Sequence, residues 1–427
     1  MSLTPWCKVF PRIFGHERLV SHAPHSTYPH FLSFSPAGKG ERSFYGVFLL
    51  QTALFLAFSN PLQAQDSRPN FAKRYLNGIF NDTTDIRQPQ FIIYPTLAFA
   101  PETSWEIGVS PLYVYYARRD TSNRLSEING FAFVTLENQY GLWLDHANYT
   151  HENKWFFLGS LRVQTFPLKY FGIGMDVPLG PENKHLAIVD ANQIQFKERV
   201  LRKVSENFFV GPEFDFQRFS SVRFLDRPEA PAFERPQGDA GSTNFGIGWG
   251  LVWDERHNVL NVRHGNFHEL AYLRYHPALS TFDFHTVISD NRIFRTLRPN
   301  QVLAIQALGV FNAGEVPFNQ LGLLGGESLM RGYYLGRFRD KHYLAGQVEY
   351  RFLPLPLGFT KRLGAAVFAG AGSVAPRLRP EAFTKLAYSG GAGLRFLLFP
   401  KKDIYTRLDY ARTPEGSGVY FFIGEAF

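Results

Sequence analysis

The sequence predicts an all-β fold, a transmembrane antiparallel β-barrel of about 16 strands. Three observations support this prediction. Apolar and polar residues alternate along many short segments, aromatic residues make up 16% of the chain, and long and short connections between the segments alternate. Barrel strands alternate in this way because one face meets lipid and the other a polar lumen, and aromatic rings gather at both membrane interfaces.

The clearest strand is residues 341–353, where the alternation is strict. One face is apolar and consists of Leu344, Gly346, Val348, Tyr350 and Phe352. The other face consists of Ala345, Gln347, Glu349 and Arg351. Successive side chains of a strand point to opposite sides of the sheet. The carboxylate and the guanidinium need water or each other, so we expect the second face to line the lumen.

Sixteen segments carry this kind of pattern between turn residues. The expected strands are 91–99, 104–117, 126–138, 140–151, 154–165, 190–203, 206–219, 243–254, 265–276, 281–290, 300–312, 341–353, 363–372, 386–398, 402–412 and 417–427. An even number of strands is the rule for bacterial single-chain barrels. No segment of this region has the pattern of a long helix.

The lengths of the connections support the same architecture. If the N-terminus is periplasmic, the long connections all fall outside the cell, at 166–189, 220–242, 313–340 and 373–385. The short connections 151–154, 204–207 and 399–403 fall on the periplasmic side. Outer-membrane barrels have long outer loops and short periplasmic turns.

An apolar run before the barrel has the features of a signal peptide. Lys39 and Arg42 precede the apolar residues 44–58, and small and polar residues follow them. We predict a signal peptide over 44–64, with cleavage between Ala64 and Gln65. The run is shorter than the roughly 20 residues of a spanning helix. An uncleaved membrane anchor is the alternative interpretation.

The segments on either side of the signal peptide have no fold of their own in this interpretation. Residues 1–43 are rich in proline and histidine, and are interpreted as a disordered leader or a mis-called start. Residues 65–90 are too few for an independent domain and are predicted to form a short periplasmic tail or plug. Cys7 in the leader is the only cysteine, so the mature chain has no disulfide and no thiol nucleophile.

Five motifs together resemble a known family. They are YFGIG (170–174), WDERHNVLNVRHGNF (253–267), LGGESLMRGYYLGRFRD (324–340), QVEYRF (347–352) and FFIGEAF (421–427). In this order they resemble the bacterial surface antigen family, the barrel half of the outer membrane protein 85 superfamily. The resemblance covers roughly residues 91–427 and implies a barrel related to outer-membrane insertases and two-partner secretion transporters.

The resemblance also implies a latch between a loop and the barrel wall. The sixth outer loop, with Arg331, Gly332 and Tyr333, would fold back into the lumen, where Arg331 would meet Glu349, with Arg351 following on the same strand. A guanidinium and a carboxylate make a strong, often bidentate pair. This pair could fix the loop structurally or take part in gating.

The chain departs from the family pattern in two places. The family usually has an Asp on the next strand, but residues 367–372 read VFAGAG, with Gly370 in its place. We therefore expect a weaker latch, or one that depends on Glu349 alone. The insertases and transporters also carry periplasmic POTRA domains before the barrel, and the segment 65–90 has no room for one. The resemblance therefore predicts a POTRA-less member.

The C-terminal strand is expected to carry an assembly signal, again by resemblance. Its residues are Phe421, Ile423, Gly424 and Phe427. A strand that ends on Phe427 implies that the terminus itself is paired and anchored, because unpaired termini usually fray.

Other polar residues receive structural interpretations. Arg395, Arg407 and Asp409 fall on the presumed lumen face of adjacent strands, where mutual pairing would set the electrostatics of the lumen. His264 and His268 lie about 13 Å apart on a strand and cannot share a metal ion. The cluster Asp254, Glu255 and His257 is interpreted as a solvated periplasmic turn. No catalytic residue, metal or cofactor is predicted.

Two functions remain open at this level. The first is a membrane-assembly or translocation factor that acts at the seam between the first and last strands, which Pro95 and Gly418 weaken. The second is a passive channel or receptor; an outer-membrane enzyme is a minor third alternative. Expected partners are outer-membrane lipid, the outer-membrane assembly machinery during biogenesis and a possible separate periplasmic protein. We predict a monomer in the bacterial outer membrane that binds no nucleic acid, since the net charge of +8 is scattered.

Overall fold

The computed structural model describes residues 85–427 apart from 101–103, 137–138, 166, 179–183 and 257. The predicted leader (1–43) and signal peptide (44–64) lie outside the described residues. So does most of the predicted tail (65–84). No helix in the described ranges is long and apolar enough to cross a membrane.

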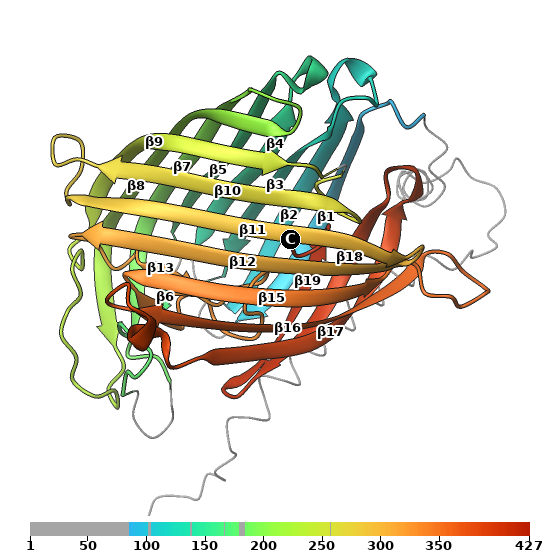
Figure 1. The fold of residues 1–427 in the computed structure, drawn as a ribbon. Helices are drawn as coiled ribbons and strands as arrows, with labels where there is room; N and C mark the ends of the chain where they lie inside the picture. Colours follow the sequence, from blue (N-terminus) through green and yellow to red (C-terminus); the bar gives the residue numbers. More distant parts are fainter. Residues whose placement is uncertain (1–84, 101–103, 137–138, 166, 179–183, 257) are drawn as a thin grey trace, which may run out of the picture.

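Sixteen long strands form the fold (Figure 1). They are β1 (Gln90–Ala100), β2 (Ser104–Tyr116), β3 (Leu125–Thr135), β4 (Tyr140–Tyr149), β5 (Trp155–Thr165), β7 (Ala187–Lys203), β8 (Phe208–Asp226), β9 (Ser242–Asp254), β10 (Gly265–Tyr275), β11 (Phe284–Arg298), β12 (Gln301–Gly314), β15 (His342–Phe352), β16 (Leu363–Ala375), β17 (Ala387–Phe399), β18 (Ile404–Thr413) and β19 (Gly416–Ile423). Three short strands lie in outer loops: β6 (Leu168–Tyr170), β13 (Gly322–Leu324) and β14 (Phe338–Asp340).

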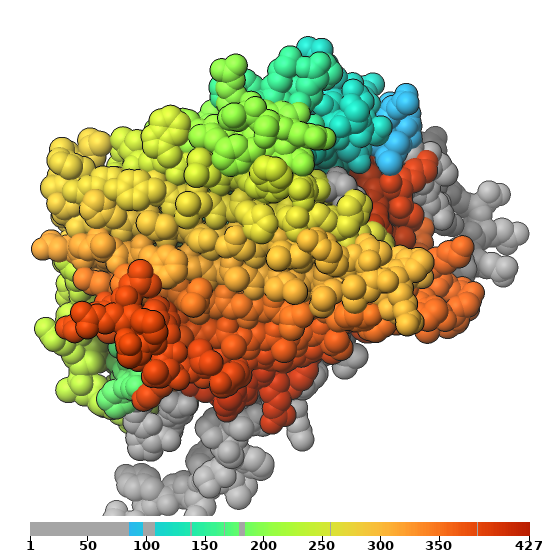
Figure 2. Space-filling view, in the orientation of Figure 1, coloured from blue at the N-terminus to red at the C-terminus, as the bar shows by residue number. Residues whose placement is uncertain are grey.

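Each long strand pairs antiparallel with the next long strand of the chain. The sheet curls into a barrel, and its outer surface is visible in Figure 2. β1 lies near β18 and β19, at the two ends of the sheet (Figure 1). Among the described residues, no backbone pairing joins β1 to β19.

All sixteen predicted strands are present, and the differences are at their ends. β11 continues to Arg298, past the predicted end at 290, and β8 continues to Asp226 instead of 219. The extra residues include Arg292, Arg295 and Arg223, which interrupt the apolar pattern but pair in the ladder. The three short strands and the four 3-10 turns were not predicted, because segments of three or four residues carry no period.

The alternation along β15 separates lipid-facing from lumen-facing residues as the sequence predicts. Leu344 and Val348 are exposed on the outside, whereas Ala345, Glu349 and Arg351 are buried inside the barrel. The same rule holds for β9, where Trp249 and Trp253 are exposed and the alternate residues are buried. The buried side chains therefore lie in the lumen, and the site described below is built there.

Candidate functional site

The loop between β12 and β15 carries an arginine back to the barrel wall. The short strands β13 and β14 pair with each other and form the stem of this loop. At its tip, Met330 and Gly332 both have positive φ, of 61° and 102°. A side chain at Gly332 would start 2.7 Å from Cγ2 of Thr413. Glycine there lets the loop approach β18 closely, and the turn directs Arg331 to the wall.

Arg331 is buried against two acids, one from each of two strands. Its Nη2 lies 2.7 Å from Oε2 of Glu349 on β15, and its Nη1 lies 2.5 Å from Oδ2 of Asp409 on β18. The guanidinium also lies over the ring of Phe368 at 3.4 Å from the centroid. Arg331 is 1% exposed and both acids are 0% exposed, so this cation is neutralised by the protein and not by solvent.

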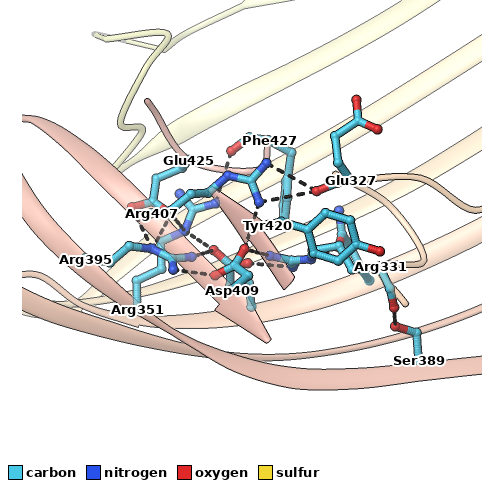
Figure 3. Close-up of polar contacts among 12 residues, drawn as sticks. Glu327, Arg331, Arg351, Ser389, Arg395, Arg407, Asp409, Tyr420, Glu425 and Phe427 are labelled. Atoms are coloured by element: carbon cyan, nitrogen blue, oxygen red, sulfur yellow. Dashed lines mark hydrogen bonds and ion pairs between the residues drawn. The ribbon is translucent and has the colours of Figure 1, made fainter. Parts of the chain in front are cut away.

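Three further arginines of the wall share these acids (Figure 3). Glu349 accepts hydrogen bonds from Nε of Arg351 at 2.8 Å and from Arg395 at 3.3 Å. Asp409 accepts from Arg395 at 2.5 Å and from Arg407 at 2.7 Å. Glu425 accepts from Nε of Arg395 at 2.9 Å. We call this set the latch wall: Arg331, Glu349, Arg351, Arg395, Arg407, Asp409 and Glu425.

The alternative in which the latch depends on Glu349 alone is therefore wrong, because Asp409 is a second acid for Arg331. Gly370 indeed supplies no acid, and Arg331 lies 2.5 Å from Asp409 instead. Asp409 is on β18, two strands further along the sheet than Gly370. Sequence reasoning placed Arg395, Arg407 and Asp409 in a separate lumen pairing; the structure joins them to the arginine of the loop.

Other contacts hold the loop to β17, β18 and β19. The backbone N–H of Gly332 donates to the Tyr420 hydroxyl on β19 at 2.8 Å, and the Ser389 hydroxyl on β17 donates to the carbonyl of Arg331 (Figure 3). Arg337 makes a bidentate pair with Glu415, in the turn between β18 and β19, at 2.5 and 2.7 Å. The loop is thus fastened to the last hairpin of the sheet.

The outer loop between β5 and β7 contacts the other side of the loop between β12 and β15. In the YFGIG segment the N–H of Gly174 donates to the carbonyl of Arg339 at 2.8 Å. Arg339 lies over the ring of Tyr170, 5.1 Å from its centroid, and Arg337 lies over Phe171 at 5.2 Å. Two motifs that the sequence singled out separately are therefore in contact. Tyr333 of the predicted latch is also buried, packed against Phe338.

The turn between β9 and β10 crosses the periplasmic end of the lumen. Asn258 donates to the carbonyl of Lys402 at 2.8 Å, and Asn261 donates to the carbonyl of Asp403 at 3.0 Å. Arg263 pairs with Asp403 in bidentate fashion, and hydrogen bonding to this carboxylate raises the pKa of Arg263. This turn was predicted to be a solvated one. It is instead a structured strap that reaches the turn between β17 and β18.

The acids and histidines of that turn have separate surroundings. Asp254 is fully buried and accepts hydrogen bonds from Tyr149 at 2.6 Å and from Nε of Arg256 at 2.9 Å. Glu255 accepts from Asn266 at 2.6 Å, and His268 bonds Asn291 at 3.0 Å. His257 lies outside the described residues. Within the described ranges, no three His, Cys, Asp or Glu side chains are grouped to hold a metal ion.

The C-terminal residues leave the sheet before the chain ends. β19 stops at Ile423, and Gly424 turns the chain with a φ of 88°. The N–H of Glu425 then donates to Leu260 of the strap at 2.9 Å. Phe427 is buried in a cluster with Val262 and Phe294, below Arg351. The expectation that the strand runs to a paired Phe427 is therefore wrong, whereas Phe421 remains on the exposed outer face.

In the part of the chain that the structure describes, side chains and not a backbone ladder join the ends of the sheet at the periplasmic side. Ile92 of β1, Ile404 of β18 and Ile423 of β19 belong to one apolar cluster around Leu260. Nζ of Lys402 donates to the carbonyl of Gln88, just before β1, at 3.1 Å. The sequence signals for this arrangement, Pro95 and Gly418, predicted weak pairing but not the strap.

A second charge cluster lies on the wall formed by β7, β8 and β10. Arg199 pairs with Glu269 at 2.6 Å and with Glu213 at 2.9 Å. Lys197 lies 3.0 Å from the same Glu213. We call Lys197, Arg199, Glu213 and Glu269 the strand wall. All four residues belong to strands, and the ion pairs described here join one strand to another.

A family model supports the relationship that the motifs suggested. The Omp85 superfamily domain matches residues 171–427. No curated protein matches the chain significantly. Among solved structures, the chain is similar to BamA from Haemophilus ducreyi lacking POTRA domains 1–3, with 13% identity and a TM-score of 0.48 over 79% of this chain and 69% of that chain.

Two further structures are similar. CdiB from Acinetobacter baumannii has 10% identity and a TM-score of 0.47, over 79% of this chain and 65% of that chain. OccK5 (OpdH) from Pseudomonas aeruginosa has 11% identity and a TM-score of 0.25, over 78% of this chain and 96% of that chain.

Proposed function

The chain belongs to the Omp85 superfamily and is an integral β-barrel of the bacterial outer membrane, and from this premise we propose that it assembles or translocates proteins at the seam between β1 and β19. The loop from β12 to β15 acts in this proposal as a latch that sets how firmly the last strands are held. No chemical catalysis is part of the proposal.

The observation that carries the proposal is the state of the seam. Every other neighbouring pair of long strands has a registered ladder, but the described parts of β1 and β19 have none between them. A strand edge that has no ladder to its neighbour is a place where another strand can pair. Pro95 removes one donor from β1, and β19 has only eight residues.

The latch supports the proposal because it acts on the strands beside the seam. Through Tyr420 and Glu415 the loop is bonded to β19 and to the turn before it. Through Arg331 it is bonded to β15 and β18. Releasing the loop would therefore remove its contacts with β19 and with the turn before it, while the barrel ladder, including that between β17 and β18, stays intact.

The test is a reversible lock of the seam. Cysteines replace Ile92 and Ile423, which share one apolar cluster, and a short thiol cross-linker joins them. The control pair is Val348→Cys with Ala369→Cys, direct neighbours on β15 and β16. We expect the seam lock, and not the control, to lower the amounts of a few outer-membrane or secreted proteins in cells, with recovery when the linker is cleaved.

The result that supports the alternative is equally specific. If cells that carry the cross-linked protein keep an unchanged outer-membrane and secreted proteome but take up a solute more slowly, the barrel is a channel or receptor. Planar-bilayer conductance of the purified protein, with and without the lock, measures the same distinction.

Two partners belong to the proposal. The first is the outer-membrane assembly machinery, which would read the C-terminal residues Phe421, Ile423, Gly424 and Phe427 during biogenesis. Removal of Phe427 should then slow membrane insertion in a pulse-chase experiment more than it weakens the finished barrel. The second is a separate periplasmic protein that delivers clients, which in-cell cross-linking from the periplasmic turns would capture.

A further inference from the structure

One periplasmic turn differs from all the others in the described part of the chain. The turns at 117–124, 150–154, 204–207, 255–264, 299–300 and 400–403 contain charged or amide residues. The turn between β15 and β16, residues 353–362, reads LPLPLGFTKR. Its Phe359 is 80% exposed, the highest value among the large apolar side chains described, and Leu357 is 40% exposed. Apolar groups so exposed at one site usually mark a contact surface.

The backbone holds this turn in a defined shape. Leu357 donates to the carbonyl of Leu355 and Phe359 donates to the carbonyl of Leu357, both at 2.9 Å, which makes two successive tight turns. Pro354 and Pro356 fix φ at two further positions. The exposed rings and methyl groups are thus presented by a stiff support, and Figure 1 shows the connection projecting past the ends of the neighbouring strands.

The base of the turn is fastened to the barrel rim. The N–H of Leu353 donates to Asn300 at 2.8 Å, and Arg263 of the strap donates to the carbonyl of Leu353 at 2.8 Å. Between the turn and the rim lies an open groove of about 480 Å³, lined on the turn by Leu355 and Leu357, among others. Phe359 does not line this groove, and its ring is exposed.

The turn continues the lipid-facing surface of the barrel. Tyr350 and Phe352, the last outward residues of β15, contact each other with ring centroids 5.0 Å apart. Lys361 on the turn and Lys401 on the neighbouring turn are exposed. Aromatic rings with lysines beside them are typical of the membrane–water boundary, where the ring enters the lipid and the ammonium meets phosphate.

We propose that the β15–β16 turn is an interfacial anchor that binds the periplasmic leaflet of the outer membrane. Phe359 enters the boundary between headgroups and acyl chains, Leu357 follows it, and Lys361 binds the phosphate of an anionic phospholipid. The anchor would fix the depth of the barrel on the side of the latch wall. It does not depend on the proposed assembly function, since a channel would need the same placement.

The experiment measures the depth of the turn in a bilayer. The only cysteine of the sequence is replaced by Cys7→Ser, and single cysteines are introduced as Phe359→Cys, Leu357→Cys and, for the control, Ser205→Cys in an exposed polar turn. The full chain, with a nitroxide on each cysteine, is placed in vesicles of phosphatidylethanolamine and phosphatidylglycerol. Accessibility to oxygen, which concentrates in lipid, is compared with accessibility to a water-soluble nickel chelate.

The expected result is a severalfold higher ratio of oxygen to nickel accessibility at 359 than at 205, with an intermediate ratio at 357. Equal ratios at 359 and 205 would place the turn in water and overturn the proposal. Protection from both reagents would also overturn it, because the site would then be covered by protein, either this chain, a second copy or a partner. Leu357→Cys gives the same three readings if labelling at 359 prevents folding.

A second comparison tests the lysine. The nitroxide at 359 is measured with Lys361→Gln and again in vesicles in which phosphatidylcholine replaces phosphatidylglycerol. Either change should move the label toward water, and combining both should add little, because each removes the same ion pair with lipid. A depth that is identical in the two lipids would refute the role assigned to Lys361.

Discussion

The latch wall and the strand wall both pair buried arginines with acids. The two walls differ in what the pairs join, because the pairs of the strand wall join strands and those of the latch wall also join a loop to strands. In the strand wall, Arg199 meets Glu213 and Glu269 at 2.9 and 2.6 Å, and every partner is fixed by the ladder of its own strand. In the latch wall, Arg331 meets Glu349 and Asp409 at 2.7 and 2.5 Å, but it arrives on a loop. Among the described residues, the short strands of that loop pair with each other and not with the barrel strands. Side-chain contacts therefore hold the loop to the wall, and these ion pairs are the charged part of them.

Because of this difference, we expect the latch wall to be more sensitive than the strand wall to the removal of one charged partner. Removing one partner of a buried pair leaves the other charge without compensation, which costs far more than an exposed pair is worth. In the strand wall the damage stays within a sheet that other bonds define. In the latch wall we expect the same change also to loosen the loop and its contacts with Tyr420 on β19 and with Glu415 in the turn before it.

The largest effect is expected for Glu349→Gln. Glu349 accepts from Arg331, Arg351 and Arg395, so its loss leaves three buried cations with less acid around them. We expect a loss of about 3–5 kcal/mol in the free energy of unfolding. The matched control is Glu269→Gln, where Arg199 keeps Glu213. Urea unfolding in detergent, followed by heat-modifiable gel mobility, should show the smaller loss in the control; equal losses would erase the distinction between the walls.

A slightly smaller effect is expected on the lipid side of the latch wall. Val348→Arg places a charge among acyl chains and should cost about 2–4 kcal/mol near the midplane. Its neighbour Gln347 is an unsuitable control, because its amide bonds Gln306 and lies beside Arg331. Asn129→Lys, which points into the lumen opposite Asp145, should be tolerated. If both variants unfold alike in urea, the assignment of inner and outer faces is wrong.

The fold could be predicted from the sequence because alternation is a local property. Each strand shows its two faces in a few consecutive residues, and lipid outside and water inside make those faces chemically distinct. The strand ends were less certain, as at β11, where exposed arginines continue the ladder. The inward turn at Gly424 was missed because the rest of FFIGEAF keeps the pattern of a strand, and the reason for leaving the sheet is a distant contact with Leu260.

The site could be predicted only where a motif marked it. Arg331 and Glu349 were expected to meet, by family resemblance, and they lie 2.7 Å apart. Asp409 was assigned to the lumen but not to Arg331, because which strands face each other across a barrel depends on its curvature and not on sequence distance. The strap was missed for a similar reason, since Asn258 and Asn261 act through backbone carbonyls of residues about 140 positions away.

A moderate effect is expected for Arg331→Ala, and it should appear in the loop and not in the barrel. Glu349 keeps Arg351 and Arg395, and Asp409 keeps Arg407, so the acids stay paired and the cost should be about 1–3 kcal/mol. Limited proteolysis should cut residues 315–341 faster than in the unmodified protein. Arg199→Ala removes another buried guanidinium, from the strand wall. If it exposes the loop to protease as much, the loop is not held by Arg331.

The smallest expected effect is the coupling energy between two substitutions. Comparing a pair of substitutions within the latch wall with a pair that spans both walls distinguishes the two walls most directly. Arg331→Ala combined with Glu349→Gln should destabilise less than the sum of the two changes, by about 0.5–3 kcal/mol, because the groups touch. Full redundancy is not expected, since Asp409 also binds Arg331 and Glu349 has two other partners. Arg331→Ala combined with Glu269→Gln, one change in each wall, should add within about 0.3–0.5 kcal/mol. Both cycles are read from urea unfolding under one set of conditions. Coupling of equal size in the two cycles would mean that the lumen charges form one network, and that the loop is held by the field of the whole lumen instead of by its contacts with Glu349 and Asp409.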